Sequence, residues 1–255
     1  MKPKKIIYYQ DEIHDDFAAT RDALSGYSTP SDFDYLPQSA VQKILSSVVY
    51  RGVTPLASLW CRFAHGVYIQ NRKAVFSVPG GFFLYGNHTQ NVCDAFIPTL
   101  ISFPRRCRIV TGPDAVSLPI LQYLVPMLGG MPLPGNPACA RRFLAAIRKC
   151  IAENETVTIY PEAHIWPYYN KIRPFPADSF TYPARMKVPV IAFTVTYRER
   201  LFLRDHRPRI TVTLSDPIMP GTYQNHTELR DRVYNFMCRT VEQQNSVAYY
   251  EYRKE

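Results

Sequence analysis

The sequence predicts an α/β fold in which helices flank a central, mostly parallel sheet, with an amphipathic helical region on the N-terminal side. Two observations support this prediction. Between residues 74 and 244, short runs rich in Val, Ile, Tyr and Phe alternate with segments whose apolar residues recur every three or four positions. Strands that alternate with helices are typical of a parallel sheet. The 255 residues, 46% of them hydrophobic, are sufficient to build a buried core.

Composition divides the chain into three segments. Residues 1–38 are polar, with acidic patches and with Pro30 and Pro37, which mark loops, and we expect a lead-in that is partly helical at 11–24. We expect residues 39–70 to form amphipathic helices that can lie on a membrane surface, and residues 71–255 to form the α/β domain.

The amphipathic segment begins with apolar residues three or four apart, until Gly52 and Pro55, which we expect to interrupt the helix. A second apolar stretch contains Trp60, with Arg62 close by. This pattern describes a helix on a membrane surface and equally a helix packed on the protein's own core, because both gather their apolar residues on one side of the helix. No run reaches the ~18 apolar residues of a spanning helix, so we expect any membrane contact to be peripheral.

The third segment supplies strands and helices in alternation. We expect strands where β-branched and aromatic residues cluster, and helices where an apolar face repeats, as in Phe143, Leu144 and Ile147. The expected strands are 74–78, 82–85, 108–111, 156–160, 188–197 and 209–214, and the expected helices are 91–103, 115–128, 137–152 and 227–244.

The chain is strongly basic, with 30 Lys and Arg against 21 Asp and Glu and a formal net charge of +9. Such a charge favours anionic partners, which include lipid headgroups, phosphorylated substrates, an acidic carrier protein and nucleic acid. Each basic cluster has a simpler interpretation as a solvated face. Charge alone does not choose among these partners.

Six cysteines are scattered without a Cys-x-x-Cys pair, and acidic residues follow the basic start too soon for a secretory signal. We therefore expect no disulfide framework and no metal site. The setting that fits is the reducing cytoplasm, with the protein peripheral on the inner face of a membrane.

A histidine and a carboxylate follow the expected strand at 82–85. His88 comes directly after Gly86 and Asn87, and Asp94 lies six positions further on. α/β folds place their chemistry at the carboxyl ends of strands. A histidine whose ring is oriented by a carboxylate can remove a proton from an attacking hydroxyl at neutral pH. The pair is therefore a candidate catalytic site, and a structural histidine is the alternative.

A second polar turn follows the expected strand at 156–160 and contains Pro161, Glu162 and His164. A carboxylate in this position can hydrogen-bond a substrate hydroxyl or anchor a cationic side chain. The alternative is an ordinary turn carboxylate.

Together these two stretches resemble the glycerolipid acyltransferase family, typified by 1-acylglycerol-3-phosphate acyltransferase. That family has an Asn-His-x4-Asp block followed by a Phe-Pro-Glu-Gly-Thr-Arg-Ser block. The separation of the two blocks in the family is similar to that of His88 and Glu162 here, which is 74 residues. The matching blocks are Asn87-His88, Leu128-Gly129-Gly130-Met131-Pro132-Leu133-Pro134, Tyr160-Pro161-Glu162 and Val188-Pro189-Val190-Ile191-Ala192, in the family's order. The resemblance covers residues 75–215.

The resemblance implies that His88, oriented by Asp94, deprotonates an acceptor hydroxyl that attacks an acyl thioester. Glu162 and the Gly129-Gly130 segment are then expected to help to place the acceptor, a lysophospholipid in phospholipid biosynthesis. Acyl-coenzyme A or an acyl-carrier protein is implied as co-substrate, with an apolar tunnel for the acyl chain. No cofactor and no metal are implied.

The chain departs from the family pattern at three places. One extra residue puts Cys93 at the family's Asp position, so a bulge or a looser turn has to restore the contact between Asp94 and His88. The family's Gly-Thr-Arg is replaced by the residues at 163–165, and Pro134 replaces an arginine of the second block.

The two replaced arginines grip the acceptor's phosphate in the family. Candidates to supply a cation instead are His164, Lys171 and Arg173 after the third block, and Arg141 and Arg142 after the second. Only arginine gives bidentate contacts to phosphate.

Several alternatives remain open. The acceptor can lack a phosphate, water can hydrolyse the thioester, or the protein can be a non-catalytic, membrane-binding relative in which the extra residue separates His88 from Asp94. Cys93 as a covalent nucleophile is a further alternative, and Cys93 and His164 are the next candidates should His88 prove dispensable. A nucleic-acid binder is not expected, because no recognised module is visible. The expected partners are therefore an acyl thioester, a lipid alcohol and an anionic membrane surface.

Overall fold

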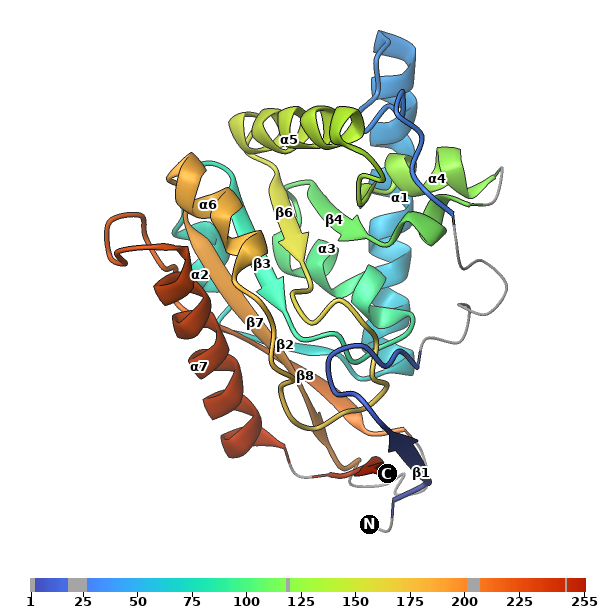
Figure 1. Cartoon of the computed structure of the whole chain (residues 1–255). Helices are drawn as coiled ribbons and strands as arrows, with labels where there is room; N and C mark the ends of the chain where they lie inside the picture. The colour runs from blue at the N-terminus through green and yellow to red at the C-terminus, as the bar shows by residue number, and fades with distance from the viewer. Residues whose placement is uncertain (1–2, 18–26, 118–119, 201–206, 246) are drawn as a thin grey trace.

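The computed structural model describes residues 3–17, 27–117, 120–200, 207–245 and 247–255. In these residues a seven-stranded sheet of order β2-β8-β7-β3-β6-β4-β5 forms the centre of the molecule (Figure 1). The strands from β7 to β5 are parallel, whereas β8 and β2 run in the opposite direction. The strands are β2 Tyr68–Gln70, β3 Phe82–Gly86, β4 Cys107–Thr111, β5 Gly130–Pro132, β6 Thr156–Ile159, β7 Val190–Arg198 and β8 Arg209–Leu214. The predicted, mostly parallel sheet is confirmed.

Helices cover both faces of this sheet. Side chains of α1 and α3 share one buried cluster with the sheet, and those of α5 and α7 share the other. The helices are α1 Ala40–Ala64, α2 Lys73–Phe76, α3 Ile97–Ser102, α4 Leu121–Met127, α5 Pro137–Ala152, α6 Thr181–Met186 and α7 His226–Gln244, with 3-10 turns η1 Cys93–Ala95, η2 Pro113–Val116 and η3 Asp178–Phe180. No helix in the described ranges combines the length and the apolar character needed to cross a bilayer.

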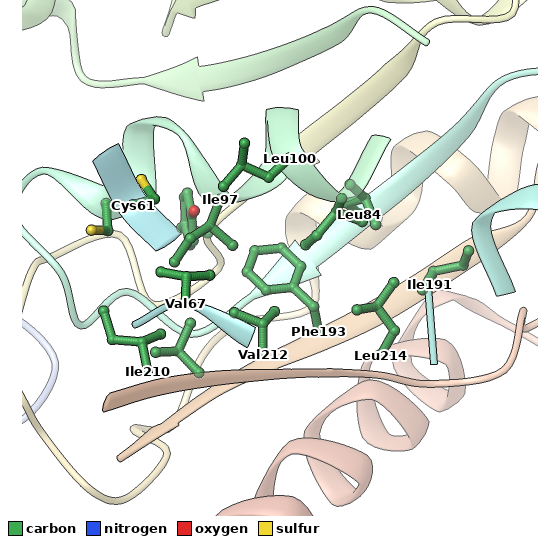
Figure 2. Close-up of a cluster of buried hydrophobic side chains, with 14 of the residues drawn as sticks. Cys61, Val67, Leu84, Ile97, Leu100, Ile191, Phe193, Ile210, Val212 and Leu214 are labelled. Atoms are coloured by element: carbon green, nitrogen blue, oxygen red, sulfur yellow. The ribbon is translucent and has the colours of Figure 1, made fainter. Parts of the chain in front are cut away.

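Strand β3 is buried on both faces because it lies at the middle of the sheet. Phe82 and Leu84 point into the cluster beneath α1 and α3, while Phe83 and Tyr85 point into the cluster beneath α5 and α7. This alternation follows from the two-residue period of a strand. Figure 2 shows Leu84 with Phe193 of β7 in the first cluster.

The structure corrects the prediction for α1, which is one continuous helix. Ser39 and Gln42 form a capping box at its start. Pro55 lies inside the helix and cannot donate to the carbonyl of Arg51. Arg51 is exposed, so water can satisfy that carbonyl. The packing of α1 against α3 and α4 outweighs the local cost of the proline.

The two faces of α1 are the reverse of those of an ordinary surface helix. The side chains that face the protein are small or polar, apart from one tyrosine: Ser46, Tyr50, Thr54, Ala57 and Cys61. Large apolar side chains are exposed instead: Val41, Ile44, Leu45, Val48, Leu56, Leu59, Trp60 and Phe63. We call these eight residues the apolar stripe.

Two further expectations need correction, and two short strands were not predicted. The expected strand at 74–78 is wrong, because residues 73–76 form the helical turn α2, which buries Ala74 and Val75. The expected helix at 115–128 is two elements, η2 and α4, and residues 118–119 lie outside the described residues. Strands β2 and β5, three residues each, have no predicted counterpart.

The lead-in belongs to the folded structure. Strand β1, Lys5–Tyr9, pairs in parallel with β9, Tyr250–Lys254, in a separate two-stranded sheet. Beyond β1, the chain lies against the loop that follows β6, where the indole of Trp166 donates to the carbonyl of Asp15 at 2.7 Å. Residues 11–17 contain no helix, and the rest of the predicted helix, 18–24, lies outside the described residues.

Candidate functional site

The candidate site begins at the carboxyl end of β3. A side chain at Gly86 would overlap the ring of Phe193, with atoms 2.0 Å apart, so only glycine lets β3 approach β7 here. The side chain of Asn87 then bonds the backbone of Val195, accepting from its N–H at 2.7 Å and donating to its carbonyl at 3.1 Å. This amide extends the β3 pairing and fixes the direction in which His88 leaves the sheet.

The structure brings His88 and Asp94 into contact. His88 Nδ1 lies 2.8 Å from Asp94 Oδ2, which also accepts from the backbone N–H of Gln90 at 2.8 Å. The Asp94 side chain is 2% exposed and that of His88 is 17% exposed, so the carboxylate is enclosed while the ring reaches the surface. No hydrogen bond joins His88 Nε2 to the described part of the protein. The ring therefore presents this nitrogen to a ligand.

The extra residue between His88 and the acid is accommodated in the turn η1. Cys93, at the family's Asp position, is buried in the cluster beneath α1, where the Cys61 thiol and burial raise its pKa. The next residue, Asp94, faces His88. Behind the turn, the hydroxyl of Tyr197 on β7 accepts a hydrogen bond from Gln90 Nε2 at 2.7 Å. Cys93 is a protonated core thiol, which argues against its role as a covalent nucleophile.

Burial has a cost at Asp94. Removal from water raises the pKa of its carboxyl, and the hydrogen bonds from His88 and from the Gln90 N–H oppose this effect. The histidine therefore stabilises the carboxylate, and the carboxylate fixes the Nδ1-protonated tautomer of His88. That tautomer leaves Nε2 unprotonated, as a general base requires.

Tyr160 is a site residue that the sequence analysis did not identify as such. Its ring stacks on the imidazole of His88, with centroids 4.4 Å apart and planes at 14°. Its hydroxyl donates to the backbone carbonyl of Asp94 at 2.7 Å. One side chain thus contacts both members of the candidate pair. The available signal was its position directly before Pro161 and Glu162.

Glu162 and Arg173 form a buried ion pair rather than an open acceptor site. Glu162 Oε2 accepts from Arg173 Nη2 at 3.1 Å and from the backbone N–H of His88 at 3.2 Å. Glu162 Oε1 accepts from the backbone N–H of Arg173 at 3.3 Å. Arg173 is 1% exposed and packs on the indole of Trp166. The pair therefore ties the loop after β6 to the loop that carries His88.

The remaining predicted cations are spread over the molecule. His164 contacts Asp16 at 3.2 Å, in the lead-in. Lys171 is exposed on the loop after β6. Arg141 and Arg142 lie on α5, which Figure 1 shows at the opposite end of β6 from its arrowhead, and Arg142 pairs with Asp34. The structure does not bring these two arginines to His88.

Gly129 and Gly130 have a structural role where the chain passes from α4 into β5. Gly129 has a φ of +100°, and a Cβ there would meet the carbonyl oxygen of Cys107 at 2.3 Å. Gly130 pairs with Ile109 at the amino end of β5. These glycines are required by close backbone packing.

An apolar cavity of about 220 Å³ lies next to the turn η1, which contains Asp94. Ala95 and Phe96, the two residues after Asp94, line it together with Gly130 and residues of α1 such as Tyr50 and Val53. No charged side chain lines this cavity. It is suited to an aliphatic chain.

Comparisons with known proteins identify the family of the chain and a similar fold. Residues 66–196, just over half of the chain, match the family model described as Acyltransferase. The crystal structure of the 1-acyl-sn-glycerophosphate (LPA) acyltransferase PlsC from Thermotoga maritima matches with a TM-score of 0.60 and 17% sequence identity, over 80% of this chain and 83% of that chain. No curated protein matches the sequence. At this identity the structural likeness concerns the fold alone.

Proposed function

Because the chain belongs to the acyltransferase family, we propose that it transfers a fatty acyl group from an acyl thioester to a hydroxyl of a lysophospholipid. The acyltransferase family and the enzyme class that the sequence predicted are confirmed by the family model. The observation that carries the proposal is the 2.8 Å contact between His88 and Asp94, with Nε2 of the ring left for a substrate. The same contact argues against the non-catalytic alternative, which needs the two residues to be apart.

In the proposed reaction, His88 Nε2 removes the proton of the acceptor hydroxyl as its oxygen bonds to the thioester carbonyl carbon. The tetrahedral intermediate then expels the thiolate, which takes the proton from the imidazolium. One C–O bond forms, one C–S bond breaks, and the proton passes from the alcohol to the thiol. Asp94 stabilises the transient imidazolium and keeps its orientation.

The apolar cavity beside Asp94 is the proposed place for the acyl chain. Its volume of about 220 Å³ and its uncharged lining suit part of an aliphatic tail. Acyl-coenzyme A and acyl-carrier protein both remain as donors in this proposal.

The acceptor has a second candidate, an alcohol without a phosphate. The observation in its favour is that Arg173 is buried against Glu162 and that Arg142 pairs with Asp34, so neither is placed to hold a phosphate. The observation in favour of an acceptor with a phosphate is that Lys171, a cation on the loop after β6, is exposed.

The test is an assay with purified protein, an acyl-coenzyme A and either 1-acylglycerol 3-phosphate or a neutral lipid alcohol. His88→Ala is expected to lower turnover by about a hundredfold to ten-thousandfold, the usual contribution of a general base, while His226→Ala at the start of α7 serves as the matched control. Undiminished turnover in His88→Ala moves the chemistry elsewhere. Thiol release without acceptor identifies hydrolysis, and the preferred alcohol identifies the acceptor class.

We further propose that α1 lies on the cytoplasmic face of a membrane with its apolar stripe in the lipid. Support comes from the reversed faces of the helix and from the net charge of +9, which favours an anionic surface. Removing residues 39–70 is a poor test, since Tyr50, Ala57 and Cys61 of α1 belong to the buried core.

Point variants test the membrane proposal instead. Leu56→Ser and Phe63→Ser are each expected to weaken vesicle binding about tenfold or more, since burial of such a side chain is worth about 1.5–3 kcal/mol. Both side chains are exposed, so the melting temperature should stay unchanged. Ile13→Ser, on an exposed residue of the lead-in, is the control, and equal losses in all three variants would contradict the proposal.

A further inference from the structure

Beside the C-terminal half of α1 lies a groove of about 480 Å³ that the proposed reaction does not use. Its walls come from α1, from β2 with the turn after it, and from α3. His88, Asp94 and Tyr160 line neither this groove nor the apolar cavity, and Thr54 lines both. The groove is larger than the apolar cavity and chemically different from it, because it contains cationic as well as apolar side chains.

The cationic part of the groove consists of Arg62 on α1 and Arg72 after β2. Two hydrogen bonds hold Arg72 in place. Its Nε donates to the carbonyl of Ile101 at 3.4 Å, and its Nη2 donates to the carbonyl of Phe103 at 2.6 Å. These contacts fix the guanidinium before any ligand arrives and leave its other N–H groups available. In the described part of the chain neither arginine is paired with a carboxylate, and no acidic residue lines the groove.

The apolar part of the groove is continuous with the apolar stripe. Leu59 belongs to both, and Leu100 of α3 and Phe103, directly after α3, form the opposite wall. A ligand that fits has an anionic end beside two arginines and an aliphatic end that reaches the surface where α1 is proposed to meet lipid.

We propose that this groove binds one anionic phospholipid of the membrane as a non-substrate ligand, with its phosphate on Arg62 and Arg72 and its acyl chains along Leu59 and Phe103. Guanidinium groups bind phosphate with paired, charge-assisted hydrogen bonds. The inference rests on the proposed membrane position of α1 and goes beyond it, because a diffuse attraction to negative lipid needs no groove.

The experiment measures flotation of the full chain with vesicles of phosphatidylcholine alone or with added phosphatidylglycerol, without acyl donor. Arg51→Gln is the matched control for Arg62→Gln, since both arginines are exposed on α1 and only Arg62 lines the groove. Arg51→Gln is expected to weaken binding to the anionic vesicles by about fivefold, the effect of one surface charge. Arg62→Gln should weaken it several times more, because bonds to the phosphate are lost as well.

Ser58→Trp tests the groove without changing charge, since Ser58 is one of its lining residues. It should reduce the preference for phosphatidylglycerol and leave binding to phosphatidylcholine vesicles intact. Equal losses in Arg51→Gln and Arg62→Gln, with no effect of Ser58→Trp, would overturn the proposal in favour of diffuse attraction.

Two other results would also overturn it. If Arg62→Gln raises the KM for a phosphate-bearing acceptor in detergent and leaves vesicle binding unchanged, the groove belongs to the substrate. If the unaltered protein binds neither vesicle, the membrane proposal fails and this one with it. The His88→Ala assay is independent of both outcomes, so failure of the proposed acyl transfer is distinguishable.

Discussion

Tyr160 makes two contacts with the candidate pair, and these can be separated by substitution. Tyr160→Phe keeps the ring on His88 and removes the hydrogen bond to the Asp94 carbonyl. We expect kcat to fall about fivefold to tenfold with little change in KM, because one hydrogen bond is worth about 1 kcal/mol and it orients the acid. In Tyr160→Leu, which also loses the stacked ring, kcat should fall further.

Steady-state kinetics over a range of pH check this prediction. A purely structural role for the hydroxyl would lower the melting temperature of Tyr160→Phe and leave kcat per folded molecule unchanged. That result would contradict a positioning role.

The buried ion pair between Glu162 and Arg173 predicts a large effect on stability. Arg173→Met leaves the Glu162 carboxylate buried without its partner and should destabilise the fold by about 3–5 kcal/mol. Lys171→Met, on an exposed residue two positions away, should change the free energy of unfolding by less than about 0.5 kcal/mol. Urea denaturation of both variants measures the difference, and similar values would contradict the assignment.

At the residue scale, the sequence predicted the contact between His88 and Asp94 but not the burial of Arg173 against Glu162. His88 and Asp94 could be predicted because a strand end, a histidine and an acid in a familiar order are local features. The burial of Arg173 could not be predicted, since it depends on the indole of Trp166 and on Glu162, which only the folded loop brings around it. The same holds for the hydroxyl of Tyr160, whose partner is a backbone carbonyl 66 residues away.

At the scale of elements, the C-terminal end of α1 carries a titratable group. Burial lowers the pKa of His65 below its ordinary value of 6.5, and the charges of Arg207 and Arg200 lower it further. The folded state therefore holds His65 neutral, while the unfolded chain takes up a proton as the pH falls below about 6.5. This contribution to stability is present above that pH and is lost as the pH falls through the depressed value.

His65→Gln should reduce that pH dependence. Urea denaturation of the unaltered protein and of the variant at a pH of about 7 and of about 5 gives four midpoints. We expect the drop in midpoint between the two pH values to be smaller in His65→Gln. An equal drop in both proteins would assign the pH dependence to other groups.

Elements differed in how far the sequence could predict them. The predicted bounds of the helix at 137–152 and of the strand at 209–214 agree with the structure, since each has a strong period and clear ends. The predicted break at Pro55 was wrong because tertiary packing along 25 residues outweighs one lost hydrogen bond. Strands β2 and β5 are too short for any period to be visible.

At the scale of the whole molecule, the β1–β9 sheet connects the two ends of the chain to the loop after β6. The ring of Tyr252 on β9 stacks on the indole of Trp166, with ring centroids 4.9 Å apart. The hydroxyl of Tyr252 donates to the carbonyl of Pro167. Tyr252→Ala should therefore loosen residues 160–173 without unfolding the central sheet. Hydrogen exchange is expected to rise in that loop and to stay unchanged in β3 and β7, and uniform changes throughout the protein would contradict this prediction.

The pairing of β1 with β9 also bears on the order in which the protein folds. Lys5 pairs with Tyr250, so this contact closes nearly the whole chain into one loop, whereas β3, β6 and β7 come together over much shorter separations. The entropic cost of closing a loop rises with its length, and contacts of this kind form late. We therefore expect the two ends to pair after the central sheet has formed. The contacts of Trp166 to Asp15 and Tyr252, and with them the ordering of the loop beside His88, are then expected to form late.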